Sequence, residues 1–167
     1  MRTLNIRQFP PLSYACNEAV NTLCTNLSFA GTDVRKIIIT SCHAAEGKSF
    51  LSMNIMRMLA KFGKTVVLID ADMRRSMISA KYHLDFDSAE EKWGLSHVLA
   101  GMATEEQALY QTNIAGAYMV PVGREVSNPL PLLNSPRFAQ LMDHLAQQVA
   151  YVLVDAPPVV RGMAAAQ

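Results

Sequence analysis

The amino-acid sequence predicts an α/β fold in which a mostly parallel sheet carries helices on both faces. Three apolar runs of strand length are rich in β-branched residues: 36–41, 65–70 and 151–155. Their continuous apolar character is typical of strands that are covered on both faces of a parallel sheet. Apolar helical patterns lie between these runs, as the crossover connections between parallel strands require.

The bulk composition is that of one globular domain. The chain has 167 residues, enough for a core, and 50% of them are apolar while 17% are charged. A net charge of +1 provides no basic field for nucleic acid, so we expect no nucleic-acid partner. The cysteines lack metal-ligand spacing, and we find neither a signal peptide nor an apolar run of membrane-spanning length. These features favour a cytoplasmic protein with reduced thiols.

Residues 42–49, Cys-His-Ala-Ala-Glu-Gly-Lys-Ser, follow the first predicted strand and precede an apolar helix expected over 50–62. A strand, a loop ending in Gly-Lys-Ser and a helix form the layout of a phosphate-binding loop. The residues expected to bind a nucleotide are Cys42, His43, Ala44, Ala45, Glu46, Gly47, Lys48, Ser49 and Phe50. The usual pattern has glycine where Cys42 stands, and the alternative is an ordinary helix N-terminus with a surface lysine.

Each end of this loop has chemistry that suits phosphate. Backbone N–H groups at a helix N-terminus and the helix dipole both favour an anion. Gly47 allows the backbone to approach the phosphates closely. The Lys48 ammonium can reach the outer phosphates, and the Ser49 hydroxyl is a hard oxygen ligand for Mg²⁺.

Carboxylates end the other two apolar runs. Asp70 and Asp72 close the second run, and Asp155 closes the third. Ligands of open α/β sheets bind outside the carboxyl ends of the strands. A strand-terminal aspartate can hold Mg²⁺ through water opposite the Ser49 hydroxyl, and a second carboxylate can orient a nucleophile. The sequence therefore predicts a Mg²⁺–nucleotide site, although residues 70–75 alone would also suit a solvated turn.

The N-terminal part is expected to lie outside the sheet. Residues 1–12, with two consecutive prolines, predict an extended arm, and residues 13–167 the nucleotide-binding domain. Residues 14–27 predict a packing helix, because apolar side chains recur at spacings of three and four. Its predicted apolar stripe is Cys16, Ala19, Leu23 and Leu27.

Further elements are expected in the second half of the chain. Residues 117–122 predict another strand. Capping-box patterns at 88–91 and 104–107 predict that a short helix follows each of them. Ser135 followed by Pro136 predicts the start of a longer helix.

Three motifs resemble those of the bacterial tyrosine kinases of capsule and exopolysaccharide synthesis, which are P-loop proteins related to the chromosome-partitioning ATPases. Residues 41–49 resemble the Walker A motif of that family, 67–75 its Walker A′ motif and 152–158 its Walker B motif. The resemblance implies a three-layer P-loop NTPase-like fold. It also implies phosphorylation of protein tyrosines, including autophosphorylation, with ATP and Mg²⁺ as cofactors.

The resemblance also implies roles for the matched residues. Lys48 would bind phosphates and stabilise charge on the transferring phosphoryl group. Asp70 would be the base that accepts the proton of an incoming tyrosine hydroxyl. Ser49 would ligate Mg²⁺ directly, with Asp72 and Asp155 in the outer shell of the ion. The expected catalytic residues are thus Lys48, Asp70 and Asp72, and the expected metal site is Ser49, Asp72 and Asp155.

The partners follow from the same resemblance. Stand-alone members of the family are cytoplasmic and are switched on at the membrane by a transmembrane polysaccharide chain-length regulator, which acts as adaptor. Their substrates are protein tyrosines. Two arginines of their N-terminal helix serve homo-oligomer formation, and Asn21 and Cys24 stand at those positions here. The family also usually has Pro-Gly where Ala44 and Ala45 stand.

Family members continue past the Walker B motif, whereas this sequence stops at Gln167, so we expect a domain that is incomplete at the C-terminus. Residues 37–39 would then form an exposed apolar sheet edge, and the chain would self-associate.

Two other functions remain open. One is a partitioning-type ATPase that uses water, which would carry lysine at the position of His43. The other is a catalytically impaired nucleotide-binding regulator, which the altered loop favours.

Overall fold

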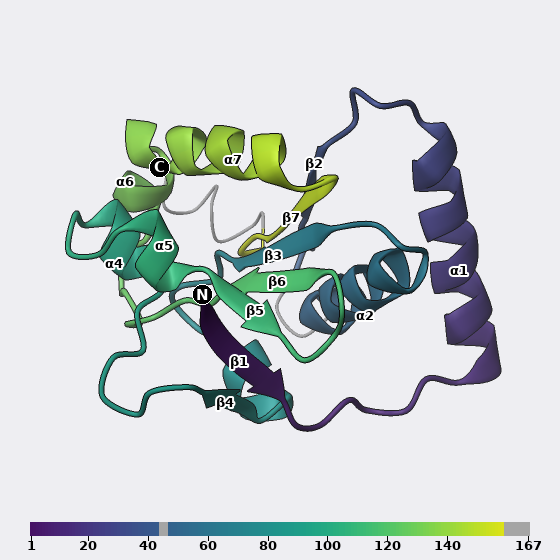
Figure 1. Cartoon of the computed structure of the whole chain (residues 1–167), viewed down its shortest axis with the longest axis horizontal. Helices are drawn as coiled ribbons and strands as arrows, with labels where there is room; N and C mark the ends of the chain where they lie inside the picture. Colours follow the sequence, from purple (N-terminus) through teal and green to yellow (C-terminus); the bar gives the residue numbers. More distant parts are fainter. Residues whose placement is uncertain (44–46, 159–167) are drawn as a thin grey trace.

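The computed structural model describes residues 1–43 and 47–158, whose arrangement is shown in Figure 1. Seven strands form one sheet in the order β2-β7-β3-β6-β5-β1-β4. The strands are β1 (Arg2–Ile6), β2 (Lys36–Ile39), β3 (Val66–Asp70), β4 (Leu84–Phe86), β5 (Tyr110–Thr112), β6 (Ala117–Val120) and β7 (Tyr151–Asp155). The helices are α1 (Tyr14–Phe29), α2 (Lys48–Lys61), α3 (Ile78–Lys81), α4 (Leu95–Leu99), α5 (Glu105–Ala108), α6 (Leu130–Leu133) and α7 (Pro136–Gln148). The predicted α/β class is confirmed.

The strands β2, β7, β3 and β6 are parallel neighbours and form the half of the sheet that positions the site. In their register, Asp155 of β7 lies opposite Ile39 of β2 on one side and opposite Asp70 of β3 on the other. Because parallel strands end at the same edge, the segments that follow β2, β3 and β7 meet there. The other half is mixed, since β5 is antiparallel to β6 and β4 is antiparallel to β1.

Alternation along the buried strands gives one apolar core on each face of the sheet. Val66 and Leu68 of β3 belong to the core that includes residues of α1 and α2. Val67 and Ile69, which point to the opposite face, belong to the core that includes residues of α4 and α7. Figure 1 accordingly shows α2 and α7 on opposite sides of the sheet, with α1 outside α2. The three-layer expectation is confirmed.

Helix α1 buries a different stripe from the predicted one. Val20 and Cys24 are buried against α2, whereas Cys16 is exposed and Leu23 is 38% exposed. Apolar residues occur on most sides of this helix, so spacings of three and four fit two neighbouring faces. One face contains Leu23 and the other contains Val20 and Cys24, each displaced by one residue along the chain. The packing of α2 decides between them, and the Cys24 thiol lies 4.0 Å from the Ile55 carbonyl oxygen.

The N-terminal residues form a sheet strand, so the prediction of an extended arm outside the domain is wrong. β1 pairs with β5 and β4, and its Leu4 and Ile6 side chains are buried. An ion pair between Arg7 and Asp85 continues the contact with β4 beyond the strand. This strand was not predicted because β1 carries polar residues between its apolar ones, and its neighbours β4 and β5 have only three residues each.

Two of the three predicted helix starts are confirmed. Thr104 accepts a hydrogen bond from the Gln107 N–H group at the start of α5. Pro136 begins α7, although the Ser135 hydroxyl donates to the Leu132 carbonyl and makes no capping bond. The pattern at residues 88–91 is not followed directly by a helix, because α4 begins only at Leu95, after Gly94. Within the described residues, no helix combines the length and apolar character needed to cross a membrane.

Candidate nucleotide-binding and catalytic site

The candidate phosphate loop runs from the end of β2 to the start of α2. Gly47 has a φ of 83° and directly precedes the first residue of α2, Lys48. Side chains other than glycine are strained at this φ, which explains why glycine is required there. Ala44, Ala45 and Glu46, which were predicted to bind nucleotide, lie outside the described residues. The strand that the sequence predicts, β2, precedes that gap, and the predicted helix, α2, follows it.

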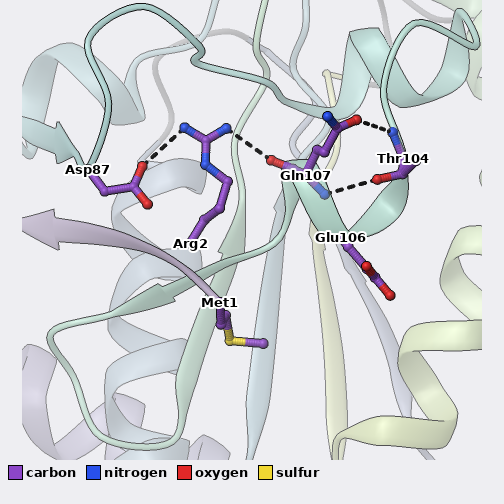
Figure 2. A pocket seen from close by; sticks show the side chains of 6 residues that line it. All are labelled: Met1, Arg2, Asp87, Thr104, Glu106 and Gln107. Carbon is purple, nitrogen blue, oxygen red and sulfur yellow. Dashed lines mark hydrogen bonds and ion pairs between the residues drawn. The ribbon is translucent and has the colours of Figure 1, made fainter.

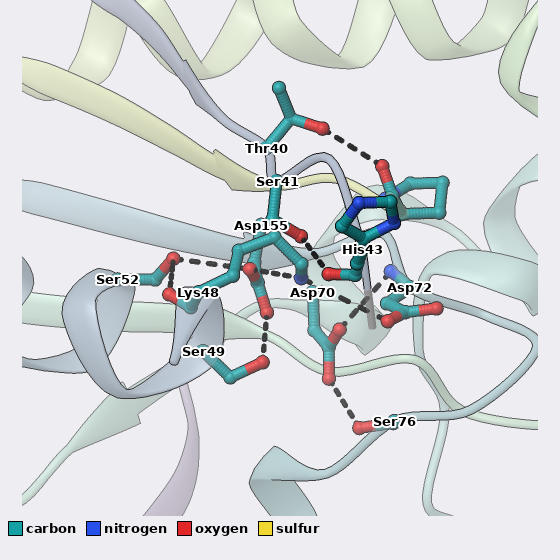
Figure 3. Close-up of polar contacts among 11 residues, drawn as sticks. Thr40, Ser41, His43, Lys48, Ser49, Ser52, Asp70, Asp72, Ser76 and Asp155 are labelled. Atoms are coloured by element: carbon teal, nitrogen blue, oxygen red, sulfur yellow. Dashed lines mark hydrogen bonds and ion pairs between the residues drawn. The ribbon is translucent and has the colours of Figure 1, made fainter. Parts of the chain in front are cut away.

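Lys48 is held by carboxylates from the two neighbouring strands. Its Nζ atom lies 2.6 Å from Asp155 Oδ1 and 3.9 Å from Asp72 Oδ2. The Lys48 residue is 9% exposed and Asp155 is fully buried, so this ion pair is shielded from water. Figure 3 shows the lysine side chain reaching from α2 across the sheet edge toward these carboxylates. Three residues predicted for the site are thus brought together.

Two hydroxyl groups from α2 complete the surroundings of Asp155. Ser49 Oγ donates to Asp155 Oδ2 at 2.9 Å, and Ser52 Oγ lies 3.1 Å from Asp155 Oδ1 and 2.9 Å from the Lys48 carbonyl. A hydroxyl has one proton, so Ser52 donates to one of these two oxygens at a time. Sequence reasoning missed Ser52. Its position four residues after Lys48, one helical turn along the same face, was the available signal.

Asp70 lies beside this cluster and has different partners. Its carboxylate accepts a hydrogen bond from Ser76 Oγ at 2.6 Å and a longer one from the Asp72 N–H group at 3.3 Å. Burial raises the pKa of Asp70 from 3.8 to about 7, an effect that the Ser76 hydrogen bond opposes and the neighbouring charge of Asp155 increases. The Asp70 carboxyl group can therefore exchange a proton near neutral pH. Ser76 was also missed by the sequence analysis.

The remaining predicted residues lie at the rim. Cys42 and His43 are exposed, and the His43 carbonyl accepts a hydrogen bond from Ser41 Oγ at 2.8 Å. Thr40 Oγ1 donates to the Pro157 carbonyl at 3.0 Å, which ties the start of the loop to the segment after β7. Phe50 is half-buried on the first turn of α2.

The donor set at Ser49 and Asp155 suits a hard divalent cation. Magnesium prefers oxygen ligands and usually keeps several waters, with one or two protein groups and substrate phosphates completing its octahedron. Among the described residues, no group of three or more His, Cys, Asp or Glu side chains is arranged to enclose a metal. An Mg²⁺ ion that binds with nucleotide needs no such cage, so the hydroxyl and carboxylate oxygens present here fit it.

A surface pocket of about 460 Å³ lies elsewhere, at the start of β1 (Figure 2). Two of its charged groups are paired with each other, since Arg2 binds Asp87 at 3.0 Å, and Arg2 also donates to the Gln107 carbonyl. Hydrogen bonding to the Thr3 N–H group keeps the pKa of Asp87 below its usual value. None of the residues predicted for the nucleotide site lines this pocket, so we do not assign it to the same function.

Comparison with known proteins agrees with the fold. The chain is 36% identical over 142 residues to the tyrosine-protein kinase CpsD of Streptococcus pneumoniae, which covers 85% of this chain and 61% of that protein. The BceF tyrosine kinase domain is 35% identical with a TM-score of 0.76, covering 87% of this chain and 57% of that one. The cell division ATPase MinD of Pyrococcus furiosus shares the fold, with 24% identity, a TM-score of 0.61 and coverage of 74% and 50%.

Similarity thus extends over most of this chain, which spans about three fifths of the length of the streptococcal relative. Residues 37–156 match the family described as the CobQ/CobB/MinD/ParA nucleotide binding domain. This range begins in the strand before the phosphate loop and ends just after Asp155, so it contains the whole cluster around Lys48. The chain therefore belongs to the CobQ/CobB/MinD/ParA nucleotide-binding domain family, within which it is similar to the bacterial tyrosine-protein kinases.

Proposed function

We propose that this chain is the catalytic part of an ATP- and Mg²⁺-dependent protein-tyrosine kinase of capsular or exopolysaccharide biosynthesis. The observation that carries the proposal is that Lys48, Asp155 and Asp70 meet at one sheet edge in a chain whose relatives include tyrosine-protein kinases. A partitioning-type ATPase is less well supported, because the similarity to MinD is lower in both identity and TM-score.

Lys48 is the phosphate-binding group of the proposed kinase. With nucleotide bound, its ammonium would exchange Asp155 for phosphate oxygens, which the N-terminus of α2 would also attract. Ser49 would ligate Mg²⁺ directly, with Asp72 and Asp155 in the outer shell of the ion. Bound Mg²⁺ neutralises charge that develops on the transferring phosphoryl group.

Asp70 is the proton acceptor for the incoming tyrosine hydroxyl. A tyrosine hydroxyl has a pKa near 10, so a buried carboxyl group with a raised pKa of about 7 is closer to it in proton affinity than an ordinary aspartate. The proton would move to Asp70 as the bond between the γ-phosphorus of ATP and the phenolic oxygen forms and the bond from that phosphorus to the β,γ-bridging oxygen breaks, so that ADP leaves. Positioning and electrostatics supply the larger part of the rate.

The cellular setting of the proposed kinase follows from its relatives and from the resemblance of its motifs. It works in the cytoplasm, at a membrane to which a transmembrane polysaccharide chain-length regulator recruits it. Its substrates are protein tyrosines. Co-purification of the chain with the cytoplasmic segment of such a regulator tests this part of the proposal.

The activity is tested by incubating the chain with γ-labelled ATP, Mg²⁺ and a glutamate–tyrosine copolymer. Label on tyrosine supports the kinase, free phosphate alone supports an ATPase, and neither product supports a nucleotide-binding regulator. Lys48→Met should abolish the label on tyrosine. Lys61→Met is the matched control, because Lys61 is an exposed lysine at the other end of the same helix. Its activity should remain within twofold of the wild type.

A further inference from the structure

We propose that Ser76 is a positioning residue for Asp70: its hydroxyl fixes carboxylate oxygen Oδ2, so that Oδ1 faces the substrate hydroxyl and accepts its proton. The inference rests on the proposed function, in which Asp70 is the base, and adds a residue that acts through it. Ser76 lies just beyond the segment that resembles the Walker A′ motif. It comes back to the carboxylate from the loop that follows β3 (Figure 3).

The two oxygens of Asp70 are held unequally. Ser76 Oγ donates to Oδ2 at 2.6 Å, a length typical of a hydroxyl bound to an ionised carboxylate. The Asp72 N–H group reaches Oδ1 at 3.3 Å, which is long for a hydrogen bond to nitrogen. Oδ1 therefore has the weaker partner and is the oxygen available to a second donor.

Asp70 depends on this hydroxyl because the nearby cation is engaged elsewhere. Lys48 is paired with Asp155 and Asp72. Among the residues that the structure describes, no ion pair reaches Asp70, although the residue is only 2% exposed. A buried carboxylate without a cation needs hydrogen bonds to fix its rotamer, and Ser76 makes the shorter of the two.

The loop that carries Ser76 is anchored on both sides. Before it, Met73 is fully buried, and its carbonyl accepts the N–H group of Val126 at 2.9 Å. Arg74 Nε donates to the Ser127 carbonyl at 3.0 Å. After it, Ile78 begins α3 and is 1% exposed. Because both flanks are fixed, the Ser76 hydroxyl meets Asp70 at a set position.

This role predicts a particular kinetic signature. Without the Ser76 hydroxyl, the Asp70 carboxylate can rotate about its Cβ–Cγ bond, so the proton acceptor is aligned for only part of the time. Poor alignment of a catalytic group lowers kcat, with a cost that can approach 100-fold. Nucleotide binding depends on Lys48 and the phosphate loop, so KM for ATP should change little.

The test measures kcat and KM for ATP with the copolymer substrate in S76A, S76T and D70N, and in the double variant S76A with D70N. We expect S76A to lower kcat about tenfold with KM for ATP within twofold. S76T, which keeps a hydroxyl, should restore at least half of the wild-type kcat. In the D70N background, S76A should cause no further loss. Ser79→Ala, an exposed serine-to-alanine change on α3, is the matched control and should behave as the wild type.

The contrary results are equally definite. Wild-type kcat in S76A, a parallel rise in KM, or losses that multiply in the double variant would each overturn the role of Ser76. If S76A does not fold by circular dichroism, Ser76→Cys replaces it, because a thiol is a similar size and a weaker donor, and a partial loss of kcat is expected. If D70N has no measurable turnover, the proposal is judged from two results: whether S76A lowers kcat without changing KM for ATP, and whether S76T restores kcat.

Failure of the proposed kinase function is recognised separately. If the wild type releases phosphate without labelling tyrosine, the kinase proposal fails, and the same variants are compared by phosphate release, where Asp70 would orient water. An unchanged rate in S76A then overturns the Ser76 proposal as well. If the wild type yields neither product, both proposals fall together.

Discussion

Asp70 and Asp155 stand opposite each other in register at the ends of β3 and β7, yet Lys48 pairs with Asp155 and not with Asp70. The Lys48 ammonium and two α2 hydroxyls surround Asp155. Asp70 has instead Ser76, and its burial raises its pKa to about 7. The two carboxyl groups thus have different surroundings, which is the basis of the different roles that we propose for them.

Replacing Lys48 by methionine should weaken the nucleotide-free fold as well as nucleotide binding. Asp155 is fully buried, and removing its cationic partner leaves a buried charge unpaired, which typically costs about 3 kcal/mol. We expect a lower free energy of unfolding in urea for K48M than for K61M. Fluorescence of a labelled ATP analogue should show binding to K61M and none to K48M. Equal stability of the two variants would contradict the buried ion pair.

The raised pKa of Asp70 predicts how stability depends on pH. Its pKa is 3.8 in the unfolded chain and about 7 in the folded chain, so between these values only the folded chain keeps the proton. The free energy of unfolding therefore falls as pH rises from about 4 to 7, and then levels off. Asp70→Asn removes this dependence. Without Mg²⁺, D70N should exceed the wild type in stability at pH 8 by on the order of a few kcal/mol, and by much less at pH 5.

Urea unfolding at pH 5 and pH 8 provides that measurement. Asp33→Asn is a suitable control, because Asp33 is an exposed aspartate in the turn before β2, away from the buried cluster at the ends of β3 and β7. The D33N variant should follow the wild type at both pH values. A stability difference between D70N and wild type that is the same at pH 5 and pH 8 would show that Asp70 is ionised throughout.

The exposed edge of the sheet predicts self-association of the chain. β2 lies at the end of the strand order, and Ile38 in its middle is 62% exposed, in agreement with the apolar edge expected from the sequence. Ile38→Lys should reduce the apparent mass by light scattering at about 50 μM. Met102→Lys changes a methionine that is equally exposed, at 62%, away from this edge. A similar mass for both variants would exclude β2 as the associating edge.

The buried stripe of α1 is tested by its cysteines. Cys24 is fully buried and burial raises the pKa of its thiol to about 11, whereas Cys16 and Cys42 are exposed. A thiol reagent at pH 8 should label the two exposed cysteines quickly and Cys24 only on unfolding. Cys24→Ser should lower the free energy of unfolding by about 1–2 kcal/mol, and Cys16→Ser by less than about 0.5 kcal/mol. Rapid labelling of Cys24 together with protection of Cys16 would instead support the stripe predicted from spacing.

Continuously apolar strands were predictable, and strands with polar positions were not. Val66–Asp70 and Tyr151–Asp155 are continuous apolar runs, which local sequence marks as buried strands. The strands β4 and β5 have three residues each, and both pair with β1, which lies far away in sequence. The buried face of α1 was likewise not predictable from its own sequence, because packing against α2 determines it. In both cases the deciding contacts are long-range.

The sequence by itself determined the kinds of groups at the site and their order along the chain. Gly47, Lys48 and the strand-terminal aspartates follow from local patterns, because a loop between a buried strand and a helix must present them at one sheet edge. Only the tertiary structure decided which partner each of these carboxylates has. Because of the register of β3 against β7 and the length of the Lys48 side chain, the Lys48 ammonium pairs with Asp155. The loop after β3 turns back toward the sheet edge, so the Ser76 hydroxyl binds Asp70. Distances of this kind depend on how separate elements pack, which no local pattern specifies.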